Sequence, residues 1–487
     1  MPMPAFSRFD LYAAPERLLA CVLLWHLSFW VLMPMLGYSM LPLDTLELLG
    51  WGQEWQWGYY KHPPLGAWLG EIALQLAGGQ LEGLYLLAQL CLVITLIYVW
   101  RTARLFLDPQ RAVLATVLLE GSYFHTYLTP NFNMNALQLP LWAGLGFHFI
   151  QAMRGRHAHW YAWGAFAALA LLSKYSGLLL LATCAGVLLS TAAGRRALRQ
   201  PQFWLASLLA LALLSPHLAW LAQHGELPLA YLRSFAGDAM PPWQAHVVEP
   251  LRFAAGALLG LLFGGMLFLT VRDRTQPTPH PSHDALLVLA LCFGPLLLAM
   301  LYGIVTGSRL KSTWTFPFFN LAGVALFLLF PTRVDARRWR RFGFALVAVI
   351  ALTSGAHLLY KTRSDRSKTA FDGRALATAI AQDWQSETDH PLRIVIADHI
   401  LASIVSGYTP SRPMMLINAD FAISLWLDDA ALDAHGAVVV CRAEVICFPT
   451  LARRDARVRT LEIDGQGFQY WFLPPADRSS GSRPDRL

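Results

Sequence analysis

The sequence has little charge and little cysteine for its length. Only 14% of its 487 residues are Asp, Glu, Lys or Arg, whereas soluble proteins carry roughly 25%. The six cysteines form no C-x-x-C pair and no Cys/His spacing typical of a zinc site. Hydrophobic residues make up 55%, and the mean hydropathy is +0.41. This composition excludes a disordered chain, a disulfide-stabilised miniprotein and an ordinary cytosolic enzyme, and it favours a polytopic membrane protein.

Apolar segments recur throughout the first 360 residues. A straight transmembrane helix needs roughly 20 apolar residues. We expect eleven spans, near 17–37, 82–100, 111–128, 135–153, 159–173, 177–193, 203–222, 251–271, 284–305, 313–331 and 342–359. The segment 65–78 is too short, and we expect an interfacial or re-entrant helix there.

Basic residues concentrate in every second loop, which indicates that these loops are cytoplasmic. The clusters contain Arg8, Arg17, Arg101, Arg104, Arg111, Arg154, Arg156, Arg195, Arg196, Arg199, Arg272, Arg274, Arg333, Arg337, Arg338, Arg340 and Arg341. With eleven spans, the tail after residue 361 falls on the other side, which would be the periplasm if the membrane is a bacterial inner membrane. Nucleic-acid binding is the weaker explanation of the excess of basic residues, because no basic stripe lies on a soluble domain.

The tail differs from the rest of the chain in composition and pattern. Residues 361–487 carry 15 Lys and Arg against 16 Asp and Glu. A helical pattern near 371–384 precedes apolar runs typical of strands, and Asp464-Gly465 predicts a hairpin. The runs are 393–397, 413–417, 437–441, 458–463 and 468–473. We therefore expect a membrane domain over 1–360 and a small α/β domain outside the membrane over 361–487.

Two cysteines, Cys441 and Cys447, fall in this outer domain. Their spacing suits two adjacent strand ends, and an oxidising compartment would permit a disulfide. The alternative is that both belong to buried apolar strands and stay reduced. The other four cysteines lie in expected spans and behave as small apolar residues.

The most informative stretch is the first outer loop, 38–65. It is polar and aromatic, and it ends in Gly58-Tyr-Tyr-Lys-His-Pro-Pro-Leu65. Asp44 and Glu47 are three residues apart, so they share one face of a helix. A carboxylate of this kind could act as a general base, although an Asp at a helix start can also be a cap.

The loop resembles a known family. An acidic residue shortly after the first span, an aromatic run and then Gly-Tyr-Tyr-x-His-Pro-Pro-Leu are similar to bacterial members of the dolichyl-phosphate-mannose-protein mannosyltransferase type, glycosyltransferase family 39, and to lipid A aminoarabinose transferases. Three later segments resemble the same family: 130–142, Ser173-Lys-Tyr-Ser-Gly177 and 308–317. Many members carry adjacent Asp-Glu where this chain has Asp44-Thr45, and the next carboxylate here is Glu47.

The resemblance implies a GT-C fold and an inverting transfer of sugar from a polyprenyl-phosphate donor, such as undecaprenyl phosphate, to a hydroxyl of a lipid or protein acceptor. Asp44 matches the position of the family's catalytic aspartate, and Glu47 is a second catalytic candidate. Such a transfer needs a base for the acceptor proton and cations near the leaving phosphate. We expect neither a metal nor a cofactor.

The outer loops contain few basic residues, and those at the membrane boundary are at the height of a lipid phosphate. We expect the donor phosphate to be bound by Lys61, Lys174, Arg309 and Lys311. We expect substrate contacts from Tyr59, Tyr60, His62, Asn131, Asn133 and Asn135. The alternatives are that the cations contact ordinary lipid headgroups, that the asparagines satisfy turn backbone and that the tyrosines are interface aromatics.

Two other functions remain possible from the sequence. A transporter or flippase for a lipid-linked sugar would be expected to show internal repeats and broken spans, and we find no repeat. A non-catalytic membrane scaffold would leave the carboxylates and cations unexplained.

Overall fold

The computed structural model describes residues 11–236, 240–278, 280–363, 369, 371–444, 447–448, 451 and 457–475. The chain divides into two compact units. The first, here called the helical unit, comprises residues 1–35, 61–65 and 85–358. The second, the loop–sheet unit, comprises residues 36–60, 66–84 and 359–487, so the first outer loop belongs to the same unit as the tail.

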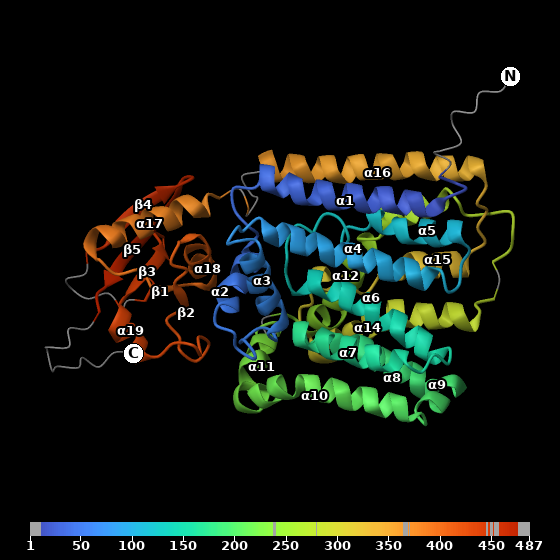
Figure 1. The fold of residues 1–487 in the computed structure, drawn as a ribbon, viewed down its shortest axis with the longest axis horizontal. Helices are drawn as coiled ribbons and strands as arrows, with labels where there is room; N and C mark the ends of the chain where they lie inside the picture. Colours follow the sequence, from blue (N-terminus) through green and yellow to red (C-terminus); the bar gives the residue numbers. More distant parts are fainter. Residues whose placement is uncertain are drawn as a thin grey trace, which may run out of the picture. The chain divides into compact units, whose positions relative to one another are not determined.

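The helical unit is an assembly of helices with short connections (Figure 1). Its helices are α1 (Pro15–Gly37), α4 (Gly83–Ala103), α5 (Pro109–Val117), η2 (Leu118–Gly121), α6 (Met134–Met153), α7 (His159–Ser173), α8 (Gly177–Ser190), α9 (Ala192–Ala197), α10 (Pro201–His224), α11 (Glu226–Arg233), η3 (Gln244–Val248), α12 (Glu249–Leu259), α13 (Leu262–Leu269), α14 (His283–Thr306), η4 (Ser312–Thr315), α15 (Ala322–Leu329) and α16 (Ala336–Arg363). Local signals explain several starts: Asp108 caps α5 before Pro109, and Ser282 caps α14.

Every expected span contains helix, but not every one is a single long helix. Among the described residues, α1, α4, α10, α14 and α16 are long and apolar enough to cross a membrane, and the bent pair formed by η3–α12 and α13 is a sixth candidate. The expected spans 111–128 and 313–331 are instead short helices joined to irregular backbone. Leu118–Gly121 and Phe316–Leu321 are buried, so neighbouring helices can shield this irregular backbone from lipid.

The arginine-rich loops meet at one end of the helical unit. Arg111 donates to the Thr332 carbonyl at 2.9 Å, and Arg338 donates to the Arg272 carbonyl at 2.9 Å. Arg154 forms an ion pair with Asp284 at 3.1 Å. Figure 1 shows α9 and the first turns of α1 and α16 at this same end. The alternation of basic loops in the sequence therefore corresponds to one physical end of the unit.

Small residues permit close helix packing in this unit. A Cβ atom on Gly164 of α7 would lie 2.3 Å from the Ala206 carbonyl oxygen of α10. A Cβ atom on Gly323 of α15 would lie 2.0 Å from the Ala115 carbonyl oxygen of α5. Helices in membranes associate largely through such close backbone approach, because burial of apolar surface gains little there.

The loop–sheet unit contains a five-stranded mixed sheet. Its elements are α2 (Leu43–Gly52), α3 (Leu65–Leu76), α17 (Gly373–Glu387), β1 (Ile394–Ala397), α18 (His399–Tyr408), β2 (Met414–Ile417), α19 (Asp429–His435), β3 (Ala437–Arg442), β4 (Arg459–Ile463) and β5 (Gln466–Leu473). The strand order is β2-β1-β3-β5-β4, with β1 parallel to β2 and β3 and with β5 antiparallel to β3 and β4. The expected helix, strands and α/β domain are confirmed.

The predicted hairpin at the edge of the sheet is also confirmed. Ile463 pairs with Gln466, so the loop consists of two residues. Asp464 and Gly465 have φ angles of 49° and 72°. Positive φ at both central positions is the requirement of a type I′ turn, and Asp-Gly meets it at low conformational cost.

The α2 helix packs against α18 within the loop–sheet unit. A Cβ atom on Gly407 of α18 would lie 2.6 Å from the Leu46 side chain, and one on Gly50 would lie 2.3 Å from Met415 of β2. Leu46, Leu49 and Met415 are each no more than 1% exposed. The first outer loop therefore shares a hydrophobic core with the tail, although more than 350 residues separate Leu46 from Gly407.

Cys441 and Cys447 form a disulfide, with their Cα atoms 6.1 Å apart. Cys441 lies opposite Gln469 of β5, one residue before the last pair of the β3–β5 ladder, Arg442 and Phe468. The other four cysteines are free. A disulfide is typical of a compartment outside the cytoplasm.

This pairing can be tested by counting thiols. Protein denatured without reductant should label at four cysteines, because the Cys441 and Cys447 sulfurs are bonded to each other, and at six after reduction; mass spectrometry gives the count. The Cys441→Ser/Cys447→Ser variant should label at four in both conditions. Six labelled thiols without reductant would contradict the disulfide.

Candidate functional site

The α2 helix carries two carboxylates that differ in exposure. Asp44 is exposed in the first turn, and Glu47 lies half-buried one turn later. Pro42 occupies the cap position of α2, and no side chain caps the helix. Asp44 is therefore not the cap residue; its carboxylate lies in the first turn, at the positive end of the helix dipole.

The tyrosines after α2 differ in their surroundings. Tyr59 is 1% exposed, stacks on Trp51 with ring centroids 5.1 Å apart and donates to the Trp51 carbonyl at 2.8 Å. Tyr60 meets Trp51 edge-on at 5.9 Å and is partly exposed. The hydroxyl of Tyr59 thus holds the loop against α2, whereas the Tyr60 ring is partly exposed.

In the helical unit, Lys174 lies where α7 ends. Its Nζ atom is 2.6 Å from Asn135 Oδ1 and 5.4 Å from the centroid of the Trp314 ring. Asn135 is in the first turn of α6, and Trp314 is in η4. Three segments that the sequence separates by up to 180 residues therefore meet around one ammonium group.

Aromatic rings connect Lys174 to the other outer-loop cations. The Phe235 ring meets Trp314 edge-on at 5.0 Å and Tyr231 at 5.2 Å. The Nζ atom of Lys311 lies 5.4 Å from the Phe235 ring, and the Nζ atom of Lys61 lies 5.8 Å from the Tyr231 ring.

Arg309 joins the same group through its backbone. Its N–H donates to the Phe235 carbonyl at 2.8 Å, and its side chain is exposed. The structure thus brings the ammonium groups of Lys61, Lys174 and Lys311, and the backbone of Arg309, to Tyr231, Phe235 and Trp314. We call these seven residues the cation–aromatic cluster.

His62 follows Lys61 and lies beside the cluster, with its ring 6.2 Å from Tyr231. Burial, together with the positive charges of Lys174 and Lys61, holds the pKa of His62 well below its ordinary value. The imidazole is therefore neutral near pH 7 and can both donate and accept a hydrogen bond.

The three asparagines have separate positions. Asn133 caps α6, since its Oδ1 accepts from the backbone N–H groups of Asn135 and Ala136. Asn135 contacts Lys174, and Asn131 lies partly exposed in the preceding turn. Asn135 therefore has a direct contact with a cation of the cluster.

Sequence reasoning did not identify a buried ionic group in the loop–sheet unit. Arg412 donates to both carboxylate oxygens of Glu71 at 3.1 and 2.8 Å and to the Leu49 carbonyl at 3.0 Å. Although burial alone would raise it, hydrogen bonds from Arg412 and Gln75 hold the pKa of Glu71 below its ordinary value. The pair is separated by 341 positions, so no local pattern signals it.

Glu54 lies near this pair, and its pKa shifts in the opposite direction. Burial raises its pKa to about 7; the charge of Arg412 opposes the rise, and that of Glu71 adds to it. Its Oε1 atom is buried and forms no hydrogen bond with any described residue. A carboxyl group of this kind is protonated in a large fraction of molecules at neutral pH.

Comparison with known proteins agrees with this geometry. Residues 61–220 match the model of the dolichyl-phosphate-mannose-protein mannosyltransferase family. The match covers Lys61, His62, the three asparagines and Lys174. No curated protein sequence matches the chain significantly.

Solved structures extend the similarity to nearly the whole chain. ArnT from Cupriavidus metallidurans in the apo state aligns with a TM-score of 0.62 and 14% identity, covering 94% of this chain and 98% of ArnT. The same protein bound to undecaprenyl phosphate aligns with a TM-score of 0.63 and 14% identity, covering 98% of this chain and 100% of ArnT. The expected resemblance is confirmed, as is the expected helical membrane fold with a C-terminal α/β domain. The family model is that of a mannosyltransferase family, and the fold is the one seen in ArnT.

The shifted pKa of Glu54 predicts a pH-dependent stability. Between about pH 4.5 and 7 the folded protein binds a proton at Glu54 that the unfolded chain releases, so this residue lowers stability as pH rises through that window. Glu54→Gln mimics the protonated form. Its thermal midpoint should match that of wild type near about pH 5 and exceed it by a few degrees near about pH 8.

A matched control separates this effect from that of removing any negative charge from the unit. Glu462→Gln removes an exposed carboxylate of β4 in the same unit and should leave the pH dependence unchanged. Thermal unfolding followed by tryptophan fluorescence measures all three proteins. Parallel curves for wild type and Glu54→Gln across this range would show that Glu54 has an ordinary pKa.

Proposed function

We propose that the protein transfers a sugar from a polyprenyl-phosphate donor, of the undecaprenyl-phosphate type, to an acceptor hydroxyl with inversion at the anomeric carbon. The reaction would take place at the membrane face opposite the arginine-rich loops, which is the periplasmic face if the protein lies in a bacterial inner membrane. The observation that carries this proposal is the convergence of Lys61, Lys174, Arg309 and Lys311 on one aromatic scaffold.

The cation–aromatic cluster would bind the donor phosphate. When the bond between the anomeric carbon and the phosphate oxygen breaks, negative charge grows on the departing polyprenyl phosphate. Ammonium and guanidinium groups placed before the reaction stabilise that charge without reorganisation. Asn135 and Trp314 keep the Lys174 ammonium in place, and neutral His62 can donate to a phosphate oxygen.

Asp44 would act as the general base. The acceptor hydroxyl attacks the anomeric carbon from the face opposite the phosphate, and its proton must leave as the new bond forms. An exposed carboxylate in the first turn of a helix is accessible to an acceptor, as this role requires. Glu47, on the same face, would orient the acceptor or share the proton.

The remaining expected residues would contact substrate. Tyr60 and Asn131 are partly exposed, and Asn135 is part of the Lys174 contact. The hydroxyl of Tyr59 and the oxygen of Asn133 already satisfy backbone groups, so these two would act by shaping the loop and the start of α6.

A substitution at Asp44 tests the base. Asp44→Asn should lower transfer by about 10²–10⁴-fold, because the amide cannot accept the acceptor proton. Transfer can be measured with purified protein, polyprenyl-phosphate sugars and membrane glycolipids or proteins as acceptors. Donor binding and thermal stability should change little, since Asp44 is exposed and does not cap α2.

Glu47→Gln provides the comparison for Asp44. It preserves the helix face and should reduce transfer less. A larger loss at Glu47 than at Asp44 would assign the base to Glu47, and near-normal turnover in both variants would contradict a carboxylate base on α2.

The cation cluster has its own test. Lys174→Met keeps the length of the side chain but removes the charge, and it should lower kcat/KM for the donor by about 10–100-fold. Arg233→Met removes another exposed base of the outer loops that forms no part of the cluster, and it should have little effect. Equal losses in the two variants would mean that Lys174 acts only through the general surface charge.

A further inference from the structure

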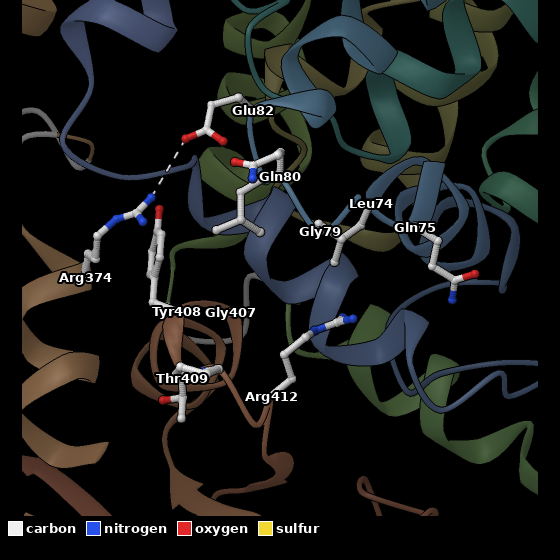
Figure 2. A pocket seen from close by; sticks show the side chains of 12 residues that line it. Leu74, Gln75, Gly79, Gln80, Glu82, Arg374, Gly407, Tyr408, Thr409 and Arg412 are labelled. Carbon is white, nitrogen blue, oxygen red and sulfur yellow. Dashed lines mark ion pairs between the residues drawn. The ribbon is translucent and has the colours of Figure 1, made fainter. Parts of the chain in front are cut away.

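A pocket of 410 Å³ lies in the loop–sheet unit, and none of the expected site residues lines it. Its walls come from the turn between α3 and α4, the first turn of α17 and the end of α18. Figure 2 shows Gln80 and Glu82 of the turn facing Arg374 of α17 and Tyr408 of α18. The volume is within the range of about 300–1,000 Å³ typical of small-molecule sites.

The polar groups in the pocket are only loosely engaged. Arg374 forms an ion pair with Glu82 at 3.8 Å and lies 5.1 Å from the centre of the Tyr408 ring. Neither the guanidinium of Arg374 nor the side-chain amide of Gln80 forms a hydrogen bond within the described part of the chain. The pocket thus offers several N–H donors, a carboxylate acceptor and an aromatic ring.

The charge distribution disfavours a phosphate in this pocket. The pocket lies at the C-terminal ends of both α3 and α18, where the helix dipoles are negative, and it includes Glu82. Asp372 caps the positive end of α17 by accepting from the Ala375 N–H at 2.9 Å. The second guanidinium in the wall, that of Arg412, is occupied by Glu71 and the Leu49 carbonyl.

A saccharide ring fits these groups better than a phosphate does. Its hydroxyls are both donors and acceptors, so Glu82 can accept from one while Arg374 and Gln80 donate to others. The apolar face of the ring can lie against aromatic or aliphatic surface, which Tyr408 and Leu74 supply. An amino substituent would gain from Glu82 and from the two helix ends.

The position of the pocket indicates a ligand carried by the membrane. Glu82 directly precedes Gly83, where the apolar helix α4 begins, so the pocket lies at the boundary of an apolar segment long enough to span. The far end of α4 carries Arg101, one of the arginines assigned to the opposite face. The Tyr408 hydroxyl also accepts from the Leu41 N–H at 2.6 Å, which ties the pocket wall to the chain three residues before Asp44.

We propose that this pocket binds the saccharide headgroup of a membrane glycolipid, through a neutral or amino-substituted ring, and that this glycolipid is the acceptor. The identification of the glycolipid as acceptor rests on the proposed function. The binding of the headgroup does not.

Native mass spectrometry of the full-length protein tests the binding. Glucosyl diacylglycerol is the probe, phosphatidylglycerol is the lipid comparison and free maltose is the soluble comparison. Wild type should retain the glucosyl lipid in preference to both. Glu82→Gln/Arg374→Gln removes both charges together, and Gln80→Trp fills the pocket from an exposed turn. Each variant should weaken binding of the glucosyl lipid by about tenfold and leave that of phosphatidylglycerol unchanged.

The control is Arg442→Gln, an exposed arginine of β3 outside the pocket, which should bind as wild type does. Unchanged glucosyl-lipid binding in both pocket variants would overturn the proposal, as would preferred binding of phosphatidylglycerol or equal binding of free maltose.

Kinetics separate this inference from the proposed function. If the glycolipid is the acceptor, the pocket variants should raise its KM by about tenfold without changing kcat or the donor KM. If wild type is active and both pocket variants have an unchanged KM for the acceptor, the acceptor role of the pocket is refuted and the proposed transferase activity stands. If the protein binds the glucosyl lipid through the pocket but transfers no sugar, the proposed transferase activity is refuted and the binding site stands.

Discussion

The bidentate ion pair between Arg412 and Glu71 is the interaction on which the geometry of the first outer loop depends. One guanidinium binds the carboxylate of α3 and the Leu49 carbonyl near the end of α2, and its own backbone enters β2. Glu71 is 4% exposed, so its charge would be costly without this partner. Arg412 has a φ of 46°, an uncommon conformation for a residue with a side chain, and the three contacts hold it there. The carboxylates of α2 and the pocket beside α18 are positioned by the same residue.

The helical unit separates two kinds of positive charge by their surroundings. At one end, arginines bind backbone carbonyls and carboxylates of neighbouring loops, as Arg338 and Arg154 do. At the other end, Lys61 and Lys311 lie over aromatic rings. Contact with a ring does not neutralise the charge of an ammonium group, whereas contact with a carboxylate does. The first arrangement fixes loops, and the second packs cations against aromatic side chains.

The sequence predicted the elements better than their assembly. The Asp464-Gly465 turn and the strands of the tail could be located because hairpin chemistry and apolar runs are local signals. The cations could be grouped because bases are rare in the outer loops. The α18 helix was not identified, since a short apolar stretch such as 400–405 is equally compatible with a strand. The raised pKa of Glu54 and the Arg412–Glu71 ion pair arise from tertiary burial between segments hundreds of residues apart. The periodicity of the sequence carries no signal of such contacts.

The packing of α2 on α18 has a consequence for biosynthesis. Leu46 and Gly407 are 361 positions apart, and chains grow at roughly 5–20 residues per second, so α2 is made about 20–70 s before its partner exists. During that interval Leu46 and Leu49, which are buried in the finished protein, have no core to enter. The loop can pack into its core only after α18 and β2 have been made, so it stays without its partners until synthesis is nearly complete.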